Sequence, residues 1–228
     1  MMSTVPGTLS MIAVALVVSA SSAPQPPSDA AARDLAQALQ RKYDTIRDFS
    51  ADFVHAYRGG VLRKELVERG HLLVKKPGKM RWQYSAPEEK LFVSDGVKLY
   101  SYVPRDKQVI VGSIPPDDQI TTPTMFLAGK GNLARDFSSS IVEPAAGMPP
   151  GTRALKLVPK LPQRDYDWLI LEVAPENLEL RGLVTVDAQG GQSSFSFANL
   201  KENTGLTDKA FAFKMPRGVD VVTDTPSR

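Results

Sequence analysis

The sequence contains no cysteine among its 228 residues and only two histidines, His55 and His71. Without cysteine there can be no disulfide, no thiolate metal site, no cysteine nucleophile and no lipid-modified N-terminal cysteine. Two histidines are too few for most imidazole-rich metal sites and make a histidine-based catalytic triad less expected. The motifs of nucleophile elbows, phosphate-binding loops and zinc hydrolases are missing too. We therefore expect no catalytic residue, no metal, no cofactor, and a protein that is not an enzyme.

An excess of one charge sign is also lacking, because 28 Lys+Arg against 25 Asp+Glu leave a net charge of only +3. The basic residues concentrate in the stretch 58–81, and the aromatic Trp82 and Tyr84 follow it. Basic and aromatic residues together are typical of a platform for single-stranded nucleic acid. The rest of the chain does not extend the patch, so we expect no nucleic-acid partner. A solvated strand face or a docking surface for an acidic partner is the preferred interpretation.

No apolar run approaches the length of about 20 residues that a membrane-spanning helix needs. The run Leu9–Val18 has ten residues and fits the hydrophobic region of a secretory signal, with a small-x-small cleavage site ending at Ala20. The usual basic region is missing, since no Lys or Arg precedes Arg33. We expect a signal peptide over 1–20, rather than a disordered tail, then a linker over 21–27. A single domain over 28–228 follows.

Hydrophobic periodicity predicts one N-terminal helix followed by many short strands. Leu35, Leu39, Tyr43 and Ile46 recur at helical spacing, whereas alternating runs fill 49–111 and 137–214. About eleven strands are expected, the last at 210–214, with a short helical insertion over 123–128 between the two groups. Helices do not alternate with strands, so we do not expect a parallel sheet. The architecture expected is an open antiparallel sheet or barrel with helices laid against it.

One hairpin allows the facing of side chains to be predicted. Leu72 and Val74 share one face of their strand, and the apolar residues Met80, Trp82 and Tyr84 share one face of the next. A two-residue loop at Pro77 would place these two sets on opposite faces, whereas a three-residue loop over 77–79 unites them. Because a one-residue slip reverses every side chain, the hydrophobic pattern favours the longer loop, which pairs Val74 with Trp82. An ordinary core is the plainest interpretation of this face.

Five segments in order resemble the LolA family, the periplasmic outer-membrane lipoprotein carriers. They are Phe49-Ser50-Ala51-Asp52-Phe53, the stretch from Gly70 to Trp82, Leu91-Phe92-Val93-Ser94-Asp95-Gly96, Thr122-Pro123-Thr124-Met125-Phe126-Leu127, and Met215-Pro216-Arg217-Gly218-Val219-Asp220. The resemblance covers nearly all of the chain after the expected signal. It implies a mainly β fold with an α lid: an incomplete antiparallel β-barrel, or half-barrel, of about eleven strands closed by short helices.

The resemblance also implies a function. A monomeric periplasmic chaperone would accept acylated lipoproteins from an inner-membrane lipoprotein-releasing ABC transporter and deliver them to an outer-membrane acceptor. Residues expected to line the lipid-binding cavity are Leu72, Val74, Met80, Trp82, Tyr84, Leu91, Val93, Met125, Phe126 and Leu127. The alternatives are a periplasmic lipid or lipopeptide sensor that regulates envelope stress, and an unusual envelope hydrolase.

One position departs from the family pattern. The family commonly has an arginine before the proline of this hairpin, where its guanidinium ties barrel to lid, and this chain has Lys76. Lysine keeps the charge but loses the planar, multi-donor fork. The resemblance implies that Lys76 is the lid latch, and its place at the strand end would let it reach carbonyls of the insertion 123–128. The alternatives are a latch elsewhere and a lysine that is simply solvated at a turn.

Overall fold

The computed structural model describes residues 27–59, 65–114, 127–129, 131–163 and 165–223. The expected signal peptide, and Met125 and Phe126 of the expected cavity, lie outside these residues. One long helix, α1 (Pro27–Thr45), begins the described chain. Its apolar stripe lies against the sheet, as the sequence predicts, with Leu35 and Leu39 buried. None of the helices described is long and apolar enough to cross a membrane.

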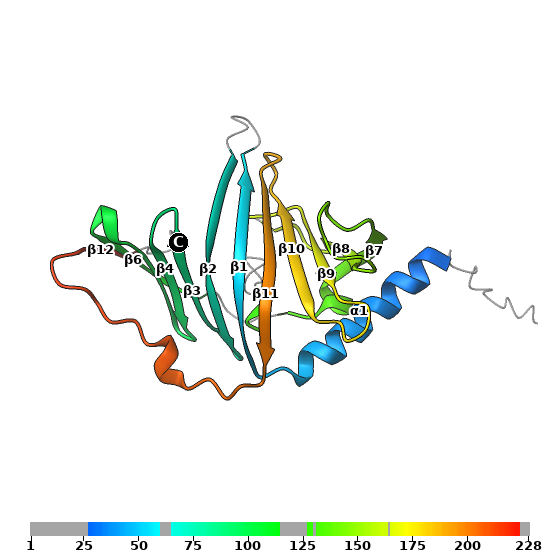
Figure 1. Cartoon of the computed structure of the whole chain (residues 1–228), viewed down its shortest axis with the longest axis horizontal. Helices are drawn as coiled ribbons and strands as arrows, with labels where there is room; N and C mark the ends of the chain where they lie inside the picture. The colour runs from blue at the N-terminus through cyan, green and yellow to red at the C-terminus, as the bar shows by residue number, and fades with distance from the viewer. Residues whose placement is uncertain (1–26, 60–64, 115–126, 130, 164, 224–228) are drawn as a thin grey trace, which may run out of the picture.

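Twelve described strands form one sheet that does not close into a barrel (Figure 1). Their order in space is β12-β6-β5-β4-β3-β2-β1-β11-β10-β9-β8-β7. Their bounds are β1 Asp48–Arg58, β2 Glu65–Lys75, β3 Lys79–Ala86, β4 Lys90–Asp95, β5 Lys98–Val103, β6 Gln108–Ser113, β7 Phe137–Val142, β8 Arg153–Pro159, β9 Trp168–Val173, β10 Leu180–Val186, β11 Gln192–Glu202 and β12 Asp220–Thr223. The expected incomplete barrel with a helical lid is confirmed.

The end of the chain differs from the prediction. The expected strand 210–214 is replaced by a short 3-10 helix, η2 (Asp208–Phe211), and β12 pairs in parallel with β6. Phe211 and Phe213 alternate as strand residues do, but they anchor this segment on the sheet instead of pairing with a strand. Phe211 is buried, and the ring of Phe213 stacks on Tyr100 with 4.8 Å between centroids.

The sheet has two faces with different partners. We call the face that carries α1 the inner face, and the face that carries Phe211 and Phe213 the outer face. Over β7 the inner face is also covered by the short helix α3 (Leu133–Asp136), which contacts α1. The main hydrophobic core lies between these helices and the inner face, and it extends along the sheet to Trp82 and Tyr84. The inner face is therefore where a ligand of the half-barrel would be held.

Candidate functional site

Five of the residues expected in the cavity share the inner face of β2 and β3. Leu72 pairs with Trp82 and Val74 pairs with Met80, and all four side chains, with Tyr84, are buried. The face is therefore as expected, but the register is not. The three-residue loop is 76–78 rather than 77–79, a slip of two residues. A two-residue slip keeps every side chain on its face, so the hydrophobic pattern alone could not detect it.

The inner face of the central strands carries a continuous group of aromatic rings. Phe53 of β1 makes edge contacts with Trp82 and Tyr84 of β3, at centroid distances of 5.1 and 4.9 Å. Phe195 of β11 lies 5.2 Å from the ring of Trp82. Tyr84 in turn contacts Phe92 of β4 at 5.7 Å. We call this set, Phe53, Trp82, Tyr84, Phe92 and Phe195, the aromatic floor.

Two residues expected in the cavity lie on the wrong face for it. Leu91 and Val93 of β4 pair with Gln83 and Arg81, so their side chains point to the outer face. Phe92, between them, pairs with Trp82 and joins the aromatic floor. On β4 it is thus the aromatic Phe92 that faces the cavity side, and not the branched residues on either side of it. Leu91 and Val93 are therefore removed from the candidate lining.

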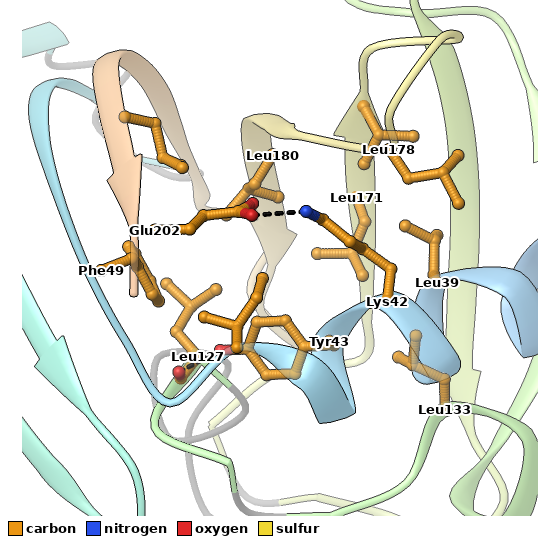
Figure 2. Close-up of a pocket in the computed structure, with 13 residues that line it drawn as sticks. Leu39, Lys42, Tyr43, Phe49, Leu127, Leu133, Leu171, Leu178, Leu180 and Glu202 are labelled. Carbon is orange, nitrogen blue, oxygen red and sulfur yellow. Dashed lines mark hydrogen bonds and ion pairs between the residues drawn. The ribbon is translucent and has the colours of Figure 1, made fainter. Parts of the chain in front are cut away.

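A cavity opens between α1 and the sheet (Figure 2). It holds about 480 Å³ not filled by protein atoms, including the part open to solvent. Its lining is almost wholly apolar: Leu39, Tyr43, Ile46, Phe49, Leu127, Leu133, Leu171, Val173, Leu178, Leu180 and Leu200, with Lys42 and Glu202. Of these, only Leu127 was named as a cavity residue from the sequence. Leu39, Tyr43 and Ile46 belong to the apolar stripe of the predicted helix. Such a stripe predicts a buried helix face and does not by itself indicate a cavity wall.

The polar contacts of the cavity join α1 to other elements. The ammonium of Lys42 on α1 forms an ion pair with Glu202 at the end of β11, as Figure 2 shows. The hydroxyl of Tyr43 donates to the carbonyl of Leu127. Burial raises the pKa of Tyr43 well above its ordinary value, so its hydroxyl stays protonated and can donate. The last turn of α1 is thus held to both the sheet and the segment that contains Leu127.

Lys76 lies in the turn after β2 and also contacts the last turn of α1. Its ammonium donates to the carbonyl of Tyr43 and lies 3.4 Å from the centroid of the Tyr43 ring. The acceptor that the structure describes is therefore on α1, whereas residues 123–126 of the insertion expected to accept lie outside the described residues. The same turn also contacts the segment that contains Leu127 and Ala128. There the amide of Gly78 donates to the carbonyl of Ala128 over 2.9 Å.

Two opposing effects act on the charge of Lys76. Burial lowers the pKa of its ammonium to about 8, although Asp44 opposes this shift. The carbonyl and ring contacts favour the charged form. Within the described residues, no group of three or more His, Cys, Asp or Glu is placed to hold a metal ion.

Comparison with known proteins identifies the family. The family model of the outer membrane lipoprotein carrier protein LolA matches residues 44–214. The chain belongs to the LolA family. Among its relatives, the outer-membrane lipoprotein carrier protein of Hahella chejuensis is 31% identical over 215 residues, which cover 92% of this chain and 97% of that protein.

A second relative agrees with this assignment, and one solved structure shares the fold. The outer-membrane lipoprotein carrier protein of Chromohalobacter salexigens is 30% identical over 191 residues, covering 83% of this chain and 87% of that protein. An uncharacterized conserved protein from Thermus thermophilus shares the fold, with a TM-score of 0.52 and 14% identity over 83% of this chain and 99% of that one. The resemblance to the LolA family read from the sequence is confirmed.

Proposed function

We propose that this protein is a periplasmic carrier that holds the acyl chains of lipoproteins between the two membranes. The observation that carries the proposal is the apolar cavity under α1, whose apolar lining belongs to the same hydrophobic cluster as the aromatic floor. Such a surface suits alkyl chains and offers little to a polar substrate. The membership of the LolA family supports the same conclusion. The donor would be a lipoprotein-releasing ABC transporter of the inner membrane, and the recipient an acceptor on the outer membrane.

The physical need for a carrier follows from the cost of exposing acyl chains to water. Burial stabilises an alkyl chain by about 0.8 kcal/mol per CH₂ group, so three long chains cannot leave a bilayer unaided at a useful rate. The volume of about 480 Å³ includes space open to solvent, so the closed structure has no room for three acyl chains. Several acyl chains therefore need more space, which movement of α1 away from the sheet would supply.

Lys76 supports reversible closure in this proposal. Its contacts with Tyr43 form only when α1 lies on the sheet, so incoming acyl chains would have to break them. These contacts then favour the empty, closed form and help to expel the chains at the acceptor. Binding without bond cleavage requires no catalytic group, in agreement with the expectation of a protein that is not an enzyme.

Mass spectrometry of protein purified gently from the periplasm tests the function. We expect co-purified acylated lipoprotein in wild type and its loss in Leu180→Glu, because a carboxylate in an apolar cavity is costly. Leu161→Glu is the matched control, since Leu161 is 75% exposed and lies outside the cavity. Turnover of the bound lipid, or equal recovery of lipoprotein with both variants, would contradict the proposal.

A further inference from the structure

The inner face changes from apolar to polar along β1 and β2. From Phe49 to Phe53 the inward positions of β1 are apolar, and the next inward position is His55. His55 pairs across the strands with Glu68 of β2. Both lie beside the aromatic floor and at the opposite end of β1 from α1. A carboxylate buried beside the aromatic floor calls for an explanation, because burying a charge is costly unless it is paired.

The polar residues here form one connected cluster. Glu68 is buried, with 6% of its side chain exposed, and its two carboxylate oxygens have different partners. One lies 2.5 Å from the ammonium of Lys90 on β4, and the other 3.4 Å from Nδ1 of His55. Nε2 of His55 lies 3.3 Å from the hydroxyl of Ser193, and its ring stacks on Phe195 at 4.2 Å. The cluster thus joins four strands of the sheet.

These groups use one another as partners, which argues against a site for a polar ligand. The carboxylate of Glu68 already has a cation on one oxygen and the imidazole near the other. Burial lowers the pKa of His55, and Glu68 only partly opposes this shift, so the imidazole is neutral at neutral pH. An alkyl chain laid over this cluster would remove its remaining water without replacing any hydrogen bond, which is unfavourable.

The distance from the α1 end to the cluster matches the length of an acyl chain. Phe49 lines the cavity under α1, and His55 is six residues further along β1. At about 3.4 Å per residue these positions are about 20 Å apart. Carbon–carbon bonds of about 1.5 Å advance an extended alkyl chain by about 1.25 Å each, so about sixteen carbons span this distance.

We propose that His55, Glu68 and Lys90 form a polar end wall that limits the length of acyl chain the half-barrel can hold. The proposal rests on the proposed function, since it names a specificity of the same site. An acyl chain that begins at the α1 end lies along Phe49, Ala51 and Phe53 and stops at His55. Each methylene adds affinity until the chain reaches the wall, and further methylenes add none.

Binding of labelled acyl peptides of graded length tests the wall. The probes are dansyl-labelled N-acyl dipeptides with saturated chains of about twelve to twenty carbons. In the wild-type protein we expect affinity to rise about fourfold per methylene and to level off near sixteen carbons. In the double variant Glu68→Met, Lys90→Met the rise continues for about two to four more carbons. Such a replacement of a buried ion pair by apolar residues is often tolerated by the fold.

The control and a second variant separate specificity from structure. Asp52→Asn, His71→Gln removes an ion pair of 2.8 Å on the outer face and leaves the levelling point unchanged. His55→Phe keeps a ring against Phe195, and should extend the range by about one or two carbons if the double variant does not fold. A wall that is only structural would change thermal stability in these variants without moving the levelling point.

The failures of the two proposals are distinguishable. A levelling point that stays at the same chain length in both wall variants overturns the end wall and leaves the carrier function standing. Wild-type protein that binds none of the probes overturns the carrier function and the end wall together.

Discussion

The inner face of the sheet has two wings that are built alike but covered differently. We call β7–β11 the covered wing and β4–β6 with β12 the open wing. On the covered wing the inward leucines Leu155, Leu171 and Leu183 are at most 2% exposed beneath the helices. On the open wing the inward Leu99 and Ile110 are 40% and 42% exposed. The inner face therefore has a buried core on the covered wing and partly exposed apolar side chains on the open wing.

The outer face shows the reverse arrangement. On the outer face of the open wing, Val93 and Val109 are fully buried, and η2, which carries Phe211, contacts β4. Among the described elements, the helical contacts of the open wing are therefore made by η2 on its outer face. The covered wing depends on α1 for its core. This difference teaches that α1 completes a core, and our proposal gives it a second role, in which it moves away from the sheet to admit acyl chains.

The largest expected effect is at the aromatic floor, where the two wings meet. Trp82→Glu should abolish acceptance of lipoprotein, because an unpaired carboxylate in this apolar face is costly. Gln83→Glu is the control, since it adds the same charge to the neighbouring, outward-facing position. Lipoprotein acceptance and circular dichroism are measured for both. A Trp82→Glu protein that is folded and accepts lipoprotein normally would show that the floor is not the binding surface.

The next largest expected effect is a difference between the two wings in the free energy of unfolding lost on mutation. Leu35→Ala removes a side chain of α1 that is 1% exposed and should lower the free energy of unfolding by about 2–5 kcal/mol. Ile110→Ala on the open wing should lower it by less than about 1 kcal/mol, because much of that side chain is already in water. Urea denaturation measures both. Equal losses would mean that the wings do not differ in how they are stabilised.

A smaller effect is expected at the contact between the turn of β2 and α1. Lys76→Leu should accept lipoprotein normally but release it about fivefold more slowly. The charged hydrogen bond to Tyr43 contributes about 1.5–3 kcal/mol, and desolvation of the ammonium offsets part of this. Lys76→Arg should release at least as well as wild type. Transfer of labelled lipoprotein to acceptor-containing membranes is the assay, and equal rates for Lys76→Leu and wild type would place the latch elsewhere.

The smallest effect concerns the segment that covers the outer face of the open wing. Asp208 lies 2.7 Å from both Lys75 and Lys79, whose hydrogen bonds lower the pKa of its carboxyl to about 2. Because this pKa is depressed in the folded state, its stabilising effect is full above about pH 4 and is lost as the pH falls toward 2. Asp208→Asn should lower Tm slightly at neutral pH, and the two proteins should converge near pH 2. A constant difference in Tm across this range would contradict the assignment.

The sequence was informative wherever a period fixed the side-chain face. It predicted α1 and the inward facing of Leu72 and Trp82, because a strand buried on one face has only two choices. It could not fix the register of β2 and β3, since a slip of two residues leaves the pattern unchanged. The parallel strand β12 has only four residues, too few for a period to be recognised.

The cavity and the polar cluster depend on contacts between distant parts of the chain. The acceptor of Lys76 is 33 residues away, on α1, and no local pattern indicates which of several carbonyls it reaches. His55 was noted only as one of two histidines, although its spacing from Phe53 places it on the inner face. Its partner Glu68 becomes visible once the register of β1 and β2 is known.

Locking α1 to the sheet tests the central claim most directly, namely that acyl chains load when α1 moves away from the inner face. The chain has no cysteine, so Lys42→Cys, Glu202→Cys supplies a unique pair at the site of the ion pair between α1 and β11. A reducible bismaleimide linker joins the two thiols. The account predicts that linked protein accepts no lipoprotein and that reductant restores acceptance. Linked protein that loads as fast as the reduced form would contradict it.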